Sequence, residues 1–117
     1  MQVTIYHNPR CSKSRATLAL LEEHGSAPRI VHYLDTPPST SELRDLLGAL
    51  GLEARDLLRS GESEYRELDL GRSELDDAAL LEAMHRHPRL IQRPIVVAAG
   101  RARIGRPPEA VLEILGQ

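Results

Sequence analysis

The chain opens with a strand, a helix and a second strand, and this order constrains its fold more than any other feature. Val3–Tyr6 is β-branched and aromatic, which predicts a strand. Residues 14–24 carry leucines at helical spacing, and Gly25 stands where a C-terminal cap belongs. Residues 29–34 predict the second strand. Because the connections are short, we expect a βαβ unit with parallel strands.

The middle of the chain has helical patterns. Ser39 precedes Glu42 by three residues, which is a capping-box pattern, and leucines follow at i, i+3, i+4 and i+7. A shorter helix is expected over residues 54–58. Asp76 is expected to cap a further helix that ends near His85.

The last part of the chain predicts a hairpin and a helix. Residues 94–98 and Arg101–Ile104 are two short strands, and Ala99-Gly100 between them favours a tight antiparallel turn. Pro107-Pro108 is typical of a helix start, and an apolar stripe follows.

The element order is therefore β-α-β, a helical segment, then β-β-α. This is the plan of an α/β, thioredoxin-like fold with a mixed four-stranded sheet. The segment at about residues 35–88 is too long for a simple crossover, so we expect it to form an inserted helical subdomain. Within it, residues 61–73 are polar and predict no firm structure. We expect a single domain over residues 1–117.

Charge and cysteine content limit the possible functions. The chain has 15 basic and 17 acidic residues, a formal net charge of −2, which argues against the basic face of a nucleic-acid-binding protein. No apolar run approaches the length of a membrane span, and the N-terminus predicts a strand rather than a signal peptide. One cysteine cannot form an internal disulfide, which favours a reducing, cytoplasmic setting. We also expect a monomer.

Cys11 stands between a strand end and a helix start. The unpaired N–H groups and the positive end of the dipole at a helix start favour a thiolate over a thiol, and the same groups can bind an oxyanion. The alternative is a buried, inert cysteine, against which the polar flanking residues argue. Dithiol redox enzymes carry a second cysteine where this chain has Ser14, so an outside thiol must complete any reaction at Cys11.

Several neighbours of Cys11 are candidates for binding an oxyanion or tuning the thiolate. Ser12 and Ser14 add hydroxyls, Lys13 adds a positive charge, and Arg15 adds another unless it points to solvent. His7 either tunes the thiolate or begins the loop as a neutral polar residue. The other four histidines lack the spacing of metal ligands, so we expect them to be structural or solvated and expect no metal site.

Three arginines further along the chain are candidates for holding an anion. Pro94 opens the third strand, where a cis proline commonly lies against the active-site cysteine of a thioredoxin-like fold, and this would place Arg93 at the site. Arg106 follows the hairpin and is expected at the same end of the sheet. Arg59 ends a short helix of the insert. A tetrahedral oxyanion needs several fixed cations, and arginine suits this role. The alternative for each is an ordinary solvated side chain.

Six motifs follow one another over nearly the whole chain. They are His7-Asn8-Pro9-x-Cys11, Tyr33-Leu34-x-Thr36-Pro37-Pro38, Leu57-Leu58-Arg59, His87-Pro88, Arg93-Pro94-Ile95-Val96-Val97 and Arg106-Pro107-x-Glu109-x-Val111-Leu112-x-Ile114-Leu115. In these motifs and their order the sequence resembles the glutaredoxin-linked arsenate reductases (ArsC family). The stretch from Asn8 to Arg15, NPRCSKSR, is similar to a shorter subgroup of that family.

The resemblance implies a mechanism. The Cys11 thiolate would attack arsenate, and Arg59, Arg93 and Arg106 would form the family's arginine triad around the oxyanion. Glutathione would attack the arsenylated cysteine as a co-substrate, glutaredoxin would reduce the mixed species, and arsenite would leave. No bound cofactor is implied.

Two other functions remain open. One is a glutathione-dependent thiol reductase with a different substrate. The other is a transcriptional regulator of the Spx type, which shares the fold, binds RNA polymerase and usually carries a second cysteine in its N-terminal motif. Fold alone does not decide between them.

Overall fold

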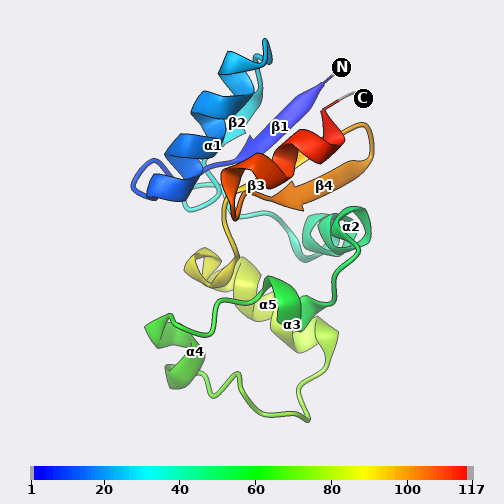
Figure 1. Ribbon diagram of the computed structural model, residues 1–117. Helices are drawn as coiled ribbons and strands as arrows, with labels where there is room; N and C mark the ends of the chain where they lie inside the picture. The colour runs from blue at the N-terminus through cyan, green and yellow to red at the C-terminus, as the bar shows by residue number, and fades with distance from the viewer. Residues whose placement is uncertain (1, 116–117) are drawn as a thin grey trace. The chain divides into compact units, whose positions relative to one another are not determined.

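A mixed four-stranded sheet forms around the first strand in the computed structural model, which describes residues 2–115 (Figure 1). β1 (Val3–Tyr6) pairs in parallel with β2 (Arg29–Val31) and antiparallel with β3 (Ile95–Ala98). β4 (Arg101–Ile104) pairs antiparallel with β3 and completes the order β2-β1-β3-β4. The predicted fold class is thus confirmed, and so is the parallel βαβ opening.

The strand β2 is shorter than predicted. It ends at Val31, because the carbonyl of His32 accepts the N–H groups of Asp35 and Thr36 at 3.0 and 2.9 Å and closes a turn there. Residues 32–34 therefore belong to the segment that follows the strand.

Two helices cover one face of the sheet, α1 (Ser12–Glu23) and the 3-10 helix η2 (Pro108–Ile114) (Figure 1). Alternate residues of β1 and β3 point into the core between sheet and helices, as the two-residue period of a strand requires. The final helix was expected from an apolar stripe, and its 3-10 geometry aligns residues three positions apart. The buried residues of this core are Val3, Ile5, Leu21, Val96, Ala98, Val111 and Ile114.

Contacts divide the chain into two compact units: a sheet unit, Met1–Thr36 with Arg93–Gln117, and a helical unit, Pro37–Gln92. The helical unit begins with α2 (Thr40–Leu50), whose predicted capping box is present. Glu42 N–H donates to Ser39 Oγ at 3.0 Å, and Ser39 N–H donates to the Glu42 carboxylate at 2.9 Å.

The other helices of the helical unit are α3 (Ala54–Leu57), α4 (Ser63–Glu67), α5 (Asp77–Arg86) and the 3-10 helix η1 (Pro88–Leu90). α2 and α3 pack on α5, and leucines from all three form the core. α4 lies where the sequence predicted no firm structure; it has no buried residue, so no apolar periodicity marks it. None of the helices within residues 2–115 is long and apolar enough to cross a membrane.

Candidate active site

Cys11 is the N-cap residue of α1, with an extended backbone. Its N–H donates to the carbonyl of Asn8 at 3.0 Å, which closes the loop after β1. Its own carbonyl accepts the N–H of Arg15 at 3.0 Å and so begins the helix. The side chain is half-buried. The sulfur therefore lies at the helix start, as the sequence predicted.

The pKa of the Cys11 thiol is lowered from its ordinary value. Burial, the largest influence, raises this pKa. The backbone N–H of Ser14, the Arg93 side chain and the backbone N–H of Lys13 oppose it by donating hydrogen bonds to the sulfur, and the positive charge of Arg93 adds to them. The lowering influences together exceed the effect of burial, so a larger fraction of Cys11 is the nucleophilic thiolate than in an ordinary cysteine.

Two arginines from the C-terminal part of the chain, Arg93 and Arg106, hydrogen-bond the Cys11 sulfur. Arg106 Nη2 donates to Cys11 Sγ at 3.7 Å, and Arg106 Nε donates to the carbonyl of Arg93 at 2.8 Å. Arg93 itself hydrogen-bonds Cys11. The Arg93–Pro94 peptide bond is cis, and so is the Arg106–Pro107 bond, for which the sequence made no prediction. The structure thus brings together a nucleophile and two cations in the sheet unit.

Ser14 is buried, and its hydroxyl bonds two residues of the loop. Its Oγ lies 2.6 Å from His7 Nδ1 and accepts the N–H of Asn8 at 3.0 Å. The Ser14 hydroxyl can accept from Asn8 and still donate to Nδ1 of a neutral His7 ring, which in that tautomer carries its hydrogen on Nε2. The pKa of His7 is lowered, first by burial and then by the charges of His32 and Arg15. Both observations favour a neutral His7.

The remaining loop candidates are exposed. The backbone N–H of Lys13 donates to the Cys11 sulfur, and the carbonyl of Lys13 accepts the Thr17 hydroxyl at 2.8 Å. Arg15 Nη1 donates to the carbonyl of Pro9 at 2.9 Å, so this side chain braces the loop. Ser12 stands in the first turn of α1. The roles predicted for the side chains of Ser12, Lys13 and Arg15 stay predictions.

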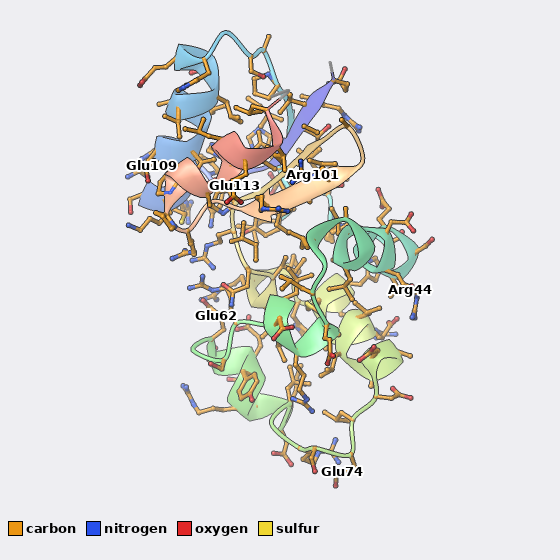
Figure 2. The ribbon with its side chains drawn as sticks, turned by 45° about the vertical axis from the view of Figure 1, so that its right-hand side comes forward. Arg44, Glu62, Glu74, Arg101, Glu109 and Glu113 are labelled. Carbon is orange, nitrogen blue, oxygen red and sulfur yellow. The ribbon has the colours of Figure 1, made fainter. Side chains whose placement is uncertain are left out.

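Arg59 belongs to the helical unit, so its role beside Cys11 also stays a prediction. Its Nε donates to the Glu62 carboxylate at 3.2 Å, and Arg89 Nη2 reaches the other oxygen of that carboxylate at 3.1 Å. Glu62 follows the turn after α3 (Figure 2). The backbone N–H of Arg59 donates to the carbonyl of Leu90 at 2.7 Å. Arg59 is thus held by both its backbone and its guanidinium.

Gly105 is a site residue that the sequence reasoning did not single out. A Cβ at this position would come within 2.8 Å of Pro94 Cγ and would also collide with the Thr17 hydroxyl. Gly105 N–H donates to the carbonyl of Pro94 at 2.9 Å. Only glycine allows the chain before Arg106 to approach this closely. A glycine directly before a candidate arginine was the available signal.

Two of the other histidines bond to backbone carbonyls. His24 Nδ1 donates to the carbonyl of Leu20 at 3.0 Å, and His85 Nδ1 donates to the carbonyl of Pro38 at 2.9 Å. In the part of the chain that the structure describes, no group of three or more His, Cys, Asp or Glu side chains could hold a metal ion.

Comparisons with known proteins point to one family. The model of the ArsC family matches residues 6–114. An uncharacterized protein of Escherichia coli, YfgD, is 60% identical over 98% of each chain. An arsenate reductase of Neisseria meningitidis serogroup A is 52% identical over 97% of this chain and 98% of its own. The solved structure of an arsenate reductase from Vibrio cholerae has 60% identity and a TM-score of 0.97, with 98% of each chain covered.

Proposed function

The chain belongs to the ArsC family, and on this premise we propose that it reduces arsenate to arsenite with Cys11 as the nucleophile. One observation carries the proposal: a cysteine of lowered pKa lies in hydrogen-bond contact with the guanidinium groups of Arg93 and Arg106. The relatives named arsenate reductase, at about half identity over nearly the full chain, supply the substrate.

In the first step the Cys11 thiolate attacks arsenic. An S–As bond forms, an As–O bond breaks, and the oxygen leaves as water after protonation. Arg93 and Arg106 bind the oxyanion and offset the charge that develops on its oxygens. Arg59 joins them as the third arginine, and the helix-start N–H groups beside Lys13 and Ser14 support the same charge.

In the second stage an outside thiol reduces arsenic, because this chain has one cysteine. Glutathione attacks the arsenylated Cys11 and forms a mixed species of Cys11, arsenic and glutathione. Glutaredoxin then reduces this mixed species, and arsenite leaves. Overall, one arsenate and two thiols give one arsenite, one disulfide and one water. Arsenic gains the two electrons that the thiols lose, and Cys11 is regenerated. The protein works as a monomer in the cytoplasm, where thiols are kept reduced, and needs no bound cofactor.

A coupled assay tests the proposal. Arsenate, glutathione, glutaredoxin, glutathione reductase and NADPH are combined with the protein, and loss of NADPH absorbance is followed. We expect arsenate-dependent turnover that is abolished in Cys11→Ser. No arsenate-dependent loss of NADPH, or turnover retained in Cys11→Ser, would contradict the proposal. Active glutaredoxin is verified with a small disulfide.

The same components separate the alternatives. Turnover of a glutathione mixed disulfide without any turnover of arsenate would favour a thiol reductase with another substrate. Retention of RNA polymerase on the immobilised protein, with no reductase activity, would favour a regulator.

A further inference from the structure

A pocket of about 360 Å³ opens beside the loop that leads to Cys11. One wall is the loop after β1, from His7 to Arg10, and the other is the segment after β2, with His32, Leu34 and Asp35. The His7 N–H donates to the carbonyl of Val31 at 2.8 Å and ties the two walls together. Both walls belong to the sheet unit, and the volume is that of a site for a small molecule.

The pocket carries both signs of charge. Arg10 stands on one wall and Asp35 on the other, and both are exposed. Among the residues that the structure describes, neither side chain has a hydrogen bond or an ion pair. Leu34 adds an apolar surface to the lining. His7 also lines the pocket, and although it is only 5% exposed its Nδ1 is taken by Ser14, so Nε2 is the ring nitrogen that can serve a ligand. Such a lining suits a zwitterion better than a simple anion.

The pocket lies on the opposite side of β1 from the arginines. In the sheet order, β2 flanks β1 on one side and β3 on the other. The pocket is built from the segment after β2, whereas Arg93 precedes β3 and Arg106 follows β4. Cys11 ends the loop between them. An oxyanion on the arginine side thus leaves the β2 side open to a second reactant.

We propose that this pocket binds the thiol co-substrate, a small zwitterionic peptide thiol such as glutathione, with Asp35 holding its ammonium group and Arg10 a carboxylate. The proposal rests on the proposed function, because that function requires an outside thiol at Cys11. From the pocket the thiolate attacks arsenic on Cys11. A second S–As bond forms, and an As–O bond breaks with its oxygen leaving as water.

Steady-state kinetics test the two charges. Asp35→Asn and Arg10→Gln should each raise the KM for glutathione about threefold to tenfold. The KM for arsenate should not change. With 2-mercaptoethanol, a thiol that carries neither an ammonium group nor a carboxylate, the two variants should have the same KM for the thiol as the parent. Asp45→Asn and Arg44→Gln, exposed on α2, are the matched controls; Arg44 extends outward from that helix (Figure 2). An unchanged KM for glutathione in both pocket variants would overturn the proposal.

A binding measurement separates this proposal from the proposed function, because it needs no arsenate. Glutathione is titrated into Cys11→Ser, and backbone amide shifts are followed by NMR. We expect saturable shifts at Asn8, Arg10 and Asp35 that weaken at least threefold when Asp35→Asn is added. These shifts with no arsenate turnover would sustain the pocket and reject arsenate as substrate. Their absence would reject the pocket whatever the arsenate assay gives.

Discussion

Ser14 Oγ lies 2.6 Å from His7 Nδ1 and joins the first turn of α1 to the end of β1. The same oxygen accepts the N–H of Asn8, while the backbone N–H of Ser14 donates to the Cys11 sulfur. One buried residue thus fixes the loop, the histidine ring and the thiolate together.

Ser14→Ala should destabilise the protein by about 1–3 kcal/mol, because it removes the hydroxyl that bonds His7 Nδ1 and the Asn8 N–H at a buried or partly buried place. Urea unfolding measures the change. Ser41→Ala, at an exposed position of α2, should stay within about 0.5 kcal/mol of the parent. Equal free energies of unfolding for the two variants would show that the Ser14 hydrogen bonds do not stabilise the protein.

The stability of the protein should fall as pH drops below about 6.5, in part through His7. The pKa of His7 is lower in the folded protein than in the unfolded chain. Between those two values the unfolded chain binds more protons, so acid favours unfolding, by at most about 1.4 kcal/mol per pH unit.

Urea unfolding at about pH 7 and about pH 5.5 measures this effect. The decrease in the free energy of unfolding between these two pH values should be smaller in His7→Gln than in the parent. His24→Gln, at an exposed position, should behave as the parent. A loss in His7→Gln as large as that of the parent would contradict the neutral state of His7.

Arg93→Gln should raise the pKa of Cys11, because it removes a hydrogen bond and a positive charge from the sulfur. The rate of alkylation by iodoacetamide as a function of pH measures this pKa. Alkylation at neutral pH should be slower than in the parent. Arg101→Gln, exposed on β4 (Figure 2), is the control and should leave the pH profile unchanged. Identical profiles for the two variants would exclude Arg93 as a partner of the thiolate.

Gly105→Ala should cost about 1–3 kcal/mol of stability and lower kcat/KM for arsenate, because its Cβ would displace Pro94 or Thr17 and with them Arg106. Gly48→Ala is the opposite case: nothing lies within 4 Å of its Cβ, and it should stabilise α2 by up to about 1 kcal/mol. Thermal unfolding and the coupled assay report both properties. Full activity in Gly105→Ala would mean that the close approach has no part in the site.

Arg59→Ala should lower kcat/KM for arsenate about 10²- to 10³-fold, the scale of losing one donor to a developing anion. Its partly buried pair with Glu62 should contribute no more than about 1 kcal/mol to stability. Arg89→Ala is the matched control, because Arg89 pairs with the same carboxylate from an exposed position. Activity in Arg59→Ala equal to that of Arg89→Ala would remove Arg59 from the site.

Local patterns predicted most of the elements. β1, β4 and the capping box of α2 have the predicted residues, because strand alternation and capping depend on neighbours within a few positions. Two predictions were wrong, the absence of structure at α4 and the end of β2, because no local pattern marks either one. α4 buries nothing and so carries no periodic signal, and β2 ends early because a turn with no sequence mark closes at His32.

The site divides in the same way. The single cysteine, its place before a helix and the lack of a second thiol at Ser14 follow from the sequence alone, because they depend on adjacent residues. Only the tertiary structure decided that Arg106 reaches a sulfur 95 residues away, that Ser14 binds His7, and that Arg15 turns to the loop. The Arg106 contact arises because pairing of β1, β3 and β4 brings distant parts of the chain to one end of the strands, and no local pattern encodes that pairing. The contacts of Ser14 and Arg15 span only six or seven residues, but they depend on how the loop folds back on α1.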